Sequence, residues 1–307
     1  MKHPHYQSFL ETHQLPESYF DTAFKAYQPV IDDILLRLKN NKPVILGING
    51  CQGSGKSTSA AFLEYIFQTA HQLNTVNISL DDFYLSKSAR LKKAATIHPL
   101  FAIRGVPGTH DIDLALQTMT DMMNGRSPKI SRFNKAIDDL FPEENWDTAP
   151  QDIDLIILEG WFLSAQPQAD FLLKNPVNDL EAQEDPQGVW RQYVNQQLKG
   201  DYQTLFQLVD CLVMLKAPSF DTVFTWRLEQ EMKLAKKLLL PKQTDEASHT
   251  GVSHQGLMNE TEIKRFVQFF QRLTESMLKE MPKRADHCYF LNTERQIIYE
   301  QHKHSNN

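Results

Sequence analysis

Hydrophobic residues follow two alternating patterns along this chain. Some short runs are almost entirely apolar, which is typical of strands buried on both faces of a sheet. Longer segments between them, such as 57–73 and 260–281, have apolar residues at helix spacing. Strands that alternate with helices predict an α/β fold, with a parallel sheet covered by helices on both faces. The predicted strands span residues 43–49, 75–80, 154–162, 211–217 and 287–292.

The same patterns predict how the chain is organised. Residues 1–42 form an N-terminal helical extension packed on the core, because apolar residues recur at helix spacing between Val30 and Leu38. Residues 43–300 form the main domain, and we read 301–307 as a solvent-exposed tail. Long irregular connections follow several strands. They are candidate substrate and lid loops, because ligands of open α/β sheets bind beyond the carboxyl ends of the strands.

Composition narrows the class of protein. The 307 residues are 23% charged and have a mean hydropathy of −0.44, which excludes a chain disordered throughout or embedded in a membrane. The net charge of −6 argues against nucleic acid or an anionic membrane as the main partner. Cys51, Cys211 and Cys288 lie far apart and include no CxxC pair, so we expect neither a disulfide framework nor a zinc cluster. We expect a cytoplasmic protein, and nothing in the sequence indicates its oligomeric state.

Glycine is scarce, with 12 residues, yet four of them fall between Gly47 and Gly55. This stretch matches the pattern G-x-x-x-x-G-K-[ST], directly after the first predicted strand. Glycines let backbone N–H groups surround phosphate oxygens, and the helix that follows points its positive end at them. Lys56 is expected to reach the β- and γ-phosphates, and Ser57 to bind Mg²⁺. The predicted phosphate-binding residues are Gly50, Gln52, Gly53, Ser54, Gly55, Lys56, Ser57 and Thr58.

The sequence lacks the motifs of two large classes of phosphate-binding protein. GTPases carry N-K-x-D for the guanine base, and the similar stretch from Asn134 to Asp138 has one residue too many. Transporter ATPases carry an LSGGQ-like signature, which this sequence lacks. The missing guanine motif favours adenine as the base.

Acidic residues follow two of the predicted strands. Asp81 and Asp82 come after the second strand, where a carboxylate can accept the proton of an attacking hydroxyl. The alternative is that both acids cap the start of a helix. The third strand delivers Glu159 at its carboxyl end, as in a Walker B strand, where it would hold Mg²⁺ directly or through water.

Taken together, these motifs resemble the plant-type D-glycerate 3-kinase family and its bacterial and fungal kinase-like relatives. The stretches that carry the resemblance are, in order, GCQGSGKST, SLDDFYL, RGVPGTHD, SRFNKAIDD, EGWFL, WRLEQE and MNETEIKRFV. That group is itself similar to uridine kinase, pantothenate kinase and phosphoribulokinase. The resemblance covers about residues 40–300. It implies a P-loop kinase fold with a five-stranded parallel sheet, acceptor loops at about 82–150 and a lid at about 220–258.

The resemblance also implies roles for individual residues. Asp81 matches the catalytic base of those kinases, and Arg227 matches a lid arginine that reaches the transferred phosphoryl group. With Lys56 and Glu159 they form the predicted catalytic set. One position departs from the bacterial relatives, because Leu140 stands where an arginine is expected. The residues expected to contact substrate are Asp82, Tyr84, Arg104, Thr109, His110, Asp111, Arg132 and Lys135.

Some of these assignments have structural alternatives. Asp111 precedes a helical segment and would also serve as its N-cap. Arg227 and Glu231 have the spacing of an ion pair on one solvated helix face. If these residues bind ligands as the resemblance implies, basic groups come together at one site of an otherwise acidic protein. Those groups are Lys56, Arg104, Arg132, Lys135 and Arg227.

The sequence therefore predicts an ATP- and Mg²⁺-dependent kinase that phosphorylates a hydroxyl of a small metabolite. D-Glycerate is the first candidate acceptor, and a nucleoside, a pantothenate-like molecule or a sugar is the alternative. A nucleotide-binding regulatory protein without turnover is the alternative from another class. Neither nucleic acid nor a membrane is expected as a partner.

Overall fold

The five apolar runs all become strands of one sheet in the computed structural model, which describes residues 6–40, 43–239 and 258–303. The strand order is β10-β9-β8-β1-β7-β2. Neighbouring strands from β2 to β9 run parallel, which agrees with the predicted five-stranded parallel core. The strands of this sheet are β1 (Val44–Gly50), β2 (Thr75–Ser79), β7 (Leu155–Gly160), β8 (Cys211–Lys216), β9 (His287–Leu291) and β10 (Ile297–His302).

The sixth strand corrects the predicted tail. β10 pairs antiparallel with β9 and includes Gln301 and His302, which the sequence analysis assigns to a solvent-exposed end. Lys303 continues this pairing, since its backbone N–H donates to the Asp286 carbonyl. Edge strands such as β10 are exposed on one side and lack the continuous apolar run of a central strand.

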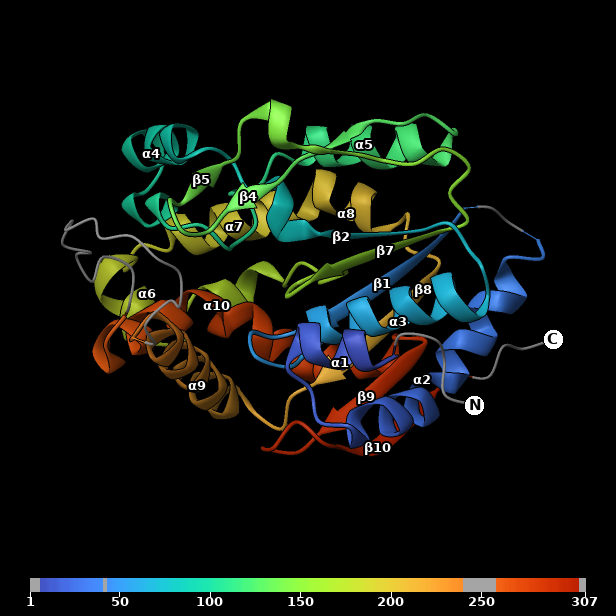
Figure 1. Cartoon of the computed structure of the whole chain (residues 1–307). Coiled ribbons are helices and arrows are strands. Elements are labelled where there is room, and N and C mark those ends of the chain that lie inside the picture. Colours follow the sequence, from blue (N-terminus) through green and yellow to red (C-terminus); the bar gives the residue numbers. More distant parts are fainter. Residues whose placement is uncertain (1–5, 41–42, 240–257, 304–307) are drawn as a thin grey trace, which may run out of the picture.

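Helices cover both faces of this sheet (Figure 1). One face packs against α1, α2, α3 and the start of α9, and the other against α5, α7, α8 and α10. The helices are α1 (Tyr6–His13), α2 (Ser18–Arg37), α3 (Lys56–Ala70), α4 (Lys87–Thr96), α5 (Ile112–Met123), α6 (Asp179–Glu184), α7 (Val189–Lys199), α8 (Asp201–Phe206), α9 (Phe220–Leu239) and α10 (Glu260–Glu280). None of the helices in the described ranges is long and apolar enough to cross a lipid bilayer.

The N-terminal helices pack on the sheet through an aromatic cluster. Phe62 of α3 is fully buried and makes ring contacts with Phe9 of α1 and with Tyr19 and Phe20 of α2. Aromatic side chains bury large areas and contribute strongly to core stability. The helical extension is therefore part of the same hydrophobic core as α3.

Parallel pairing brings three strand ends to one edge of the sheet. In β1 and β7, Asn49 pairs with Gly160, and in β2 and β7, Ser79 pairs with Glu159. The residues that follow β1 and β2 therefore lie beside the end of β7. Two short hairpins extend the chain over this edge: β3 (Lys129–Ile130) pairs with β6 (Asp147–Thr148), and β4 (Phe133–Asn134) pairs with β5 (Asp139–Leu140).

Candidate functional site

The connection between β1 and α3 has the backbone geometry of a phosphate-binding loop. Gly53 and Gly55 have φ angles of +79° and +89°, which favour glycine. A Cβ on Gly53 would lie 2.6 Å from Cβ of Trp226, and a Cβ on Gly50 would lie 2.4 Å from Oγ of Ser54. Side chains are therefore excluded at Gly50 and Gly53, so the backbone turns tightly here.

Groups around this loop are available to a ligand. Ser54 Oγ and Gln52 Oε1 are buried and have no hydrogen-bond partner among the described residues. Helix α3 begins at Lys56, and Thr58 lies in its first turn. An unpaired hydroxyl, free backbone N–H groups and the positive end of a helix fit the phosphates of a nucleotide. Cys51 is buried, and burial raises its thiol pKa to about 12.

Glu159 at the end of β7 faces the start of α3. The Ser57 hydroxyl donates to Glu159 Oε1 at 2.8 Å, and Lys56 Nζ lies 3.9 Å from Oε2. Oε2 is buried and has no hydrogen-bond partner among the described residues. A hydroxyl and a carboxylate with an unused oxygen are ligands that Mg²⁺ prefers, so these residues fit a magnesium ion beside a bound phosphate.

Asp81 lies in a short 3₁₀-helix (Leu80–Phe83) that follows β2. Its Oδ2 accepts a hydrogen bond from Lys135 Nζ at 2.7 Å, and its Oδ1 accepts one from the Tyr84 hydroxyl at 2.9 Å. Burial alone would raise the pKa of Asp81, but the charges of Lys135 and Lys56 and these hydrogen bonds hold it at about 2. Asp81 is therefore ionised at neutral pH and is available to accept a hydrogen bond from a substrate.

Asp82 is engaged in local structure. Its Oδ2 accepts from the Ser79 backbone N–H at 3.3 Å, while the Ser79 side chain caps the same 3₁₀-helix. The same oxygen binds Arg132, which also pairs with Asp147 at 2.7 Å. The predicted capping role thus applies to Asp82, and Asp81 is the acid that faces the two lysines. Burial raises the pKa of Asp82, with Arg132 opposing the shift.

The loop from Arg104 to Asp111 carries both functional and structural groups. Arg104 forms an ion pair with Asp138, and its guanidinium lies over the Phe133 ring. Asp111 caps α5 by accepting from the Leu114 backbone N–H at 3.0 Å, so the N-cap alternative is confirmed.

Thr109 is fully buried within this loop. Its hydroxyl donates to the Val106 carbonyl and accepts from the Gly105 N–H. Both hydrogen bonds lie within the loop and stabilise its conformation. Thr109 is therefore not among the residues that we propose to bind the acceptor.

The His110 ring packs against the Tyr84 ring. Its ring lies 4.4 Å from the Tyr84 ring, and its Nδ1 is 2.9 Å from the Tyr202 hydroxyl. Burial lowers the pKa of His110 to about 3, against the opposing charge of Asp81, so the ring is neutral at physiological pH. Its Nε2 is buried without a hydrogen-bond partner in the described part of the chain. His110 is thus a neutral group that positions Tyr84.

Four of the five predicted basic groups gather around these acids. The charges of Lys56 and Lys135 both act on Asp81, Arg104 is close enough to Lys135 for their charges to repel, and Arg132 binds Asp82. Arg227 lies on α9, with its guanidinium over the Phe266 ring of α10 and a contact to Gln230. Its role in phosphoryl transfer stays a prediction. Residues 240–257 of the predicted lid lie outside the described residues, as does the Glu231 side chain.

Two arginines and an acid near this site were not predicted from the sequence. Arg90 is fully buried and pairs at 2.9 Å with Asp138, the acid that also binds Arg104. Arg295, in the turn after β9, donates to the Gly53 carbonyl at 2.7 Å. These contacts join segments far apart in the sequence. The IDD stretch around Asp138 was visible in the sequence, but nothing in it indicated these partners.

Comparisons with known proteins agree with this geometry. The sequence model of the "Phosphoribulokinase / Uridine kinase family" matches residues 45–169. A Schizosaccharomyces pombe protein described as "Uncharacterized kinase mug58" is 33% identical over 224 residues, which cover 68% of this chain and 79% of that protein. This chain belongs to the phosphoribulokinase/uridine kinase family. It is therefore a P-loop kinase, a phosphotransferase whose family acts on alcohol groups.

Two further relatives of this kinase carry a substrate in their names. The chloroplastic D-glycerate 3-kinase of Arabidopsis thaliana is 29% identical over 202 residues, which cover 62% of this chain and 42% of that protein. The solved structure of a D-glycerate 3-kinase from Cryptococcus neoformans has a TM-score of 0.70 and 22% identity, covering 89% of this chain and 98% of that one. The latter similarity shows a shared fold.

Proposed function

We propose that this kinase transfers the γ-phosphoryl group of ATP, with Mg²⁺, to a hydroxyl of a small metabolite, and that D-glycerate is the first acceptor to test. The observation that carries the proposal is the position of Asp81. It is an ionised acid at the carboxyl end of β2, within the field of Lys56 from the phosphate-binding loop and hydrogen-bonded to Lys135 and Tyr84.

On the nucleotide side, each residue has a distinct task. The loop from Gly50 to Gly55 would bind the phosphates through its backbone N–H groups, and Lys56 would neutralise charge on the transferred group. Ser57 and Glu159 would hold Mg²⁺, which supplies further positive charge to the phosphates when bound. The unused Glu159 Oε2 supports this assignment.

On the acceptor side, Asp81 would take the proton of the attacking hydroxyl. Its low pKa makes it a weak base while Lys135 is bound to it. An acceptor carboxylate that binds Lys135 would draw this cation away and raise the proton affinity of Asp81. Tyr84 would keep the acid oriented through its hydrogen bond to Oδ1.

D-Glycerate suits this arrangement because it combines a carboxylate with adjacent hydroxyls. Arg104 and Lys135 are cations on the acceptor side, and each can pair with a carboxylate. The named activities of the Arabidopsis and Cryptococcus relatives support the same choice. Leu140, where the bacterial relatives have arginine, pairs with Phe133 in the β4–β5 hairpin.

An ADP-release assay over a panel of acceptors tests this proposal. The panel contains D-glycerate, related hydroxy acids, nucleosides, pantothenate and sugars, each with ATP and Mg²⁺. We expect D-glycerate to stimulate ADP release most strongly. Strong stimulation by another acceptor would replace glycerate while keeping the kinase assignment. No stimulation by any acceptor would favour a nucleotide-binding regulatory protein instead.

Replacing Lys135 tests whether this lysine lowers the pKa of Asp81. Lys135→Met removes a cation and a hydrogen bond from Asp81, so the pKa of Asp81 should rise from about 2 toward its ordinary value. The group then gains its proton at a higher pH. We therefore expect the acidic limb of the kcat/KM profile to move to higher pH, as measured in the ADP-release assay. Lys129→Met, at an exposed residue of β3, should leave the profile unchanged, and an identical shift in both variants would contradict this reading.

A further inference from the structure

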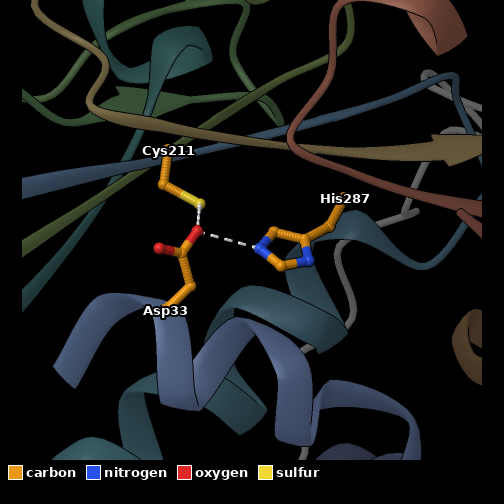
Figure 2. A group of neighbouring side chains, drawn as sticks. All are labelled: Asp33, Cys211 and His287. Atoms are coloured by element: carbon orange, nitrogen blue, oxygen red, sulfur yellow. Dashed lines mark hydrogen bonds and ion pairs between the residues drawn. The ribbon is translucent and has the colours of Figure 1, made fainter. Parts of the chain in front are cut away.

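Three side chains with metal-binding atoms meet at the other end of the sheet (Figure 2). Asp33 comes from α2, Cys211 is the first residue of β8, and His287 is the first residue of β9. These are the amino ends of the two parallel strands, whereas the phosphate-binding loop and Asp81 follow carboxyl ends. The cluster is therefore separate from the kinase site.

Two of the distances in this cluster are close to those between neighbouring ligands of a tetrahedral metal site. Asp33 Oδ2 lies 3.6 Å from Cys211 Sγ and 3.1 Å from His287 Nε2, and all three ligand atoms lie within 4.8 Å of one another. Tetrahedral zinc with ordinary bond lengths separates such ligand atoms by about 3.3–3.5 Å. A thiolate, an imidazole and a carboxylate suit zinc, whereas Mg²⁺ prefers oxygen ligands.

A second observation comes from the histidine behind the cluster. His287 Nδ1 lies 2.9 Å from His302 Nδ1, and His302 Nε2 lies 3.4 Å from Glu300 Oε2. The two ring nitrogens of His287 therefore face different partners, Nε2 toward Asp33 and Nδ1 toward His302.

A metal ion on His287 Nε2 would leave the Nδ1–H of the same ring to donate to His302 Nδ1, 2.9 Å away. Ligating histidines generally donate their second N–H to such a partner, which fixes the ring and its tautomer. We propose that Asp33, Cys211 and His287 form a zinc site that fastens α2 to β8 and β9, with His302 as a positioning residue.

The charges around this cluster and its access to solvent are compatible with a divalent cation. Arg37 donates to Asp33 Oδ1 at 2.9 Å and to Oδ2 at 3.1 Å, and it lies 3.9 Å from Asp286. A metal ion would therefore replace the Arg37 contact at Oδ2, while the contact at Oδ1 can remain. Asp33, Asp286 and a Cys211 thiolate carry three negative charges, which Arg37 and Zn²⁺ balance. Metal binding releases the thiol proton to solvent. The Asp33 side chain is 14% exposed and His287 5% exposed, so solvent can reach the Asp33 side and complete the coordination.

Cobalt substitution tests the ligand set directly. Untagged protein is treated with a chelator and titrated with Co²⁺, and the thiolate-to-cobalt charge-transfer absorption is recorded before Zn²⁺ is added. We expect one equivalent of Co²⁺ to produce the band and Zn²⁺ to abolish it. Cys211→Ser should lose the band. Cys288→Ser, at another buried cysteine in β9, should keep it and serves as the matched control.

Two further variants keep the test decisive. Circular dichroism checks that each variant is folded. If Cys211→Ser does not fold, Asp33→Asn is used in its place and should bind Co²⁺ more weakly than the wild type, with the band retained because it arises from the Cys211 thiolate. His302→Gln should keep the band but weaken zinc binding by about 10- to 100-fold, because it removes the partner of a ligating histidine.

Thermal unfolding gives an independent measurement. At a zinc concentration about 100 times Kd, Tm of the wild-type protein should rise by about 5 °C, because the ion binds only the folded state. Mg²⁺ should not produce this rise at the same concentration, and Asp33→Asn should abolish most of it. Folded wild-type protein without the charge-transfer band, or an equal band in folded Cys211→Ser, would overturn the proposal and leave the cluster as a hydrogen-bonded ion pair.

Discussion

Asp81→Asn is expected to lower kcat by about 10²–10⁴ while ATP binding is nearly unchanged. The amide keeps the size of the side chain, and its one oxygen can still accept from Lys135, while its NH2 group would face the Tyr84 hydroxyl, which can accept in place of donating. It cannot take a proton from the acceptor hydroxyl. Turnover is measured by acceptor-stimulated ADP release, and nucleotide binding by the shift of Tm with ATP.

The adjacent acid provides the matched control for this prediction. Asp82→Asn changes the same chemical group one residue away, but Asp82 binds Arg132 and the Ser79 backbone. We expect this variant to lose some stability through the weakened cap and to keep most of its turnover. A larger loss of turnover in Asp82→Asn than in Asp81→Asn would reverse the assignment of the base.

The parts of this fold that the sequence predicted correctly depend on local patterns. Val44–Gly50 is buried along its whole length, so its apolar run indicated a central strand directly. The glycines and the lysine of the phosphate-binding loop lie within one short stretch, and their spacing alone defines the loop. β10 was missed because Ile298 and Tyr299 are exposed, at 67% and 59%, and its pattern lacks a buried face.

The parts that could not be predicted depend on contacts between distant segments. Asp138 lies in the SRFNKAIDD stretch, but its neighbours there could not show that it joins Arg90 to Arg104 across 48 and 34 positions. The cysteine spacing gave no indication of the cluster at Asp33, whose partners Cys211 and His287 lie 178 and 254 positions away. Arg227 was correctly placed on a helix, but helix periodicity could not show that it faces Phe266 of α10.

The contacts of the phosphate-binding loop also link it to other elements. Trp226 of α9 lies against Gly53, and Arg295 binds the Gly53 carbonyl, lies over the Trp226 ring and pairs with Glu229. The conformation of this loop is thus held from outside by the first half of α9 and the turn after β9. Lys56 follows this loop as the first residue of α3, so the effect of its charge can be tested by changing this side chain alone.

Lys56→Met is the second change with a large expected effect. Methionine keeps the length of the aliphatic chain but removes the positive charge that lies 3.9 Å from Glu159 Oε2. Without Lys56, the charge that develops on the transferred phosphoryl group loses a fixed cation in a partly buried site. Loss of one such electrostatic contact lowers kcat by about 10²–10³. We expect the stabilisation of the fold by ATP to fall as well, because we propose that the same cation contacts the bound nucleotide.

A control variant separates this loss of turnover from general damage to the protein. Lys92→Met alters an exposed lysine of α4 and should retain wild-type turnover and the wild-type Tm shift with ATP. In Lys56→Met, the Tm without nucleotide should stay close to that of the wild type, since the lysine contributes only a long ion pair to the fold. A variant that kept both turnover and the ATP-dependent shift would show that phosphate binding does not depend on Lys56. The lysine would then serve only to neutralise Glu159, and the proposed assignment of the nucleotide site would have to be abandoned.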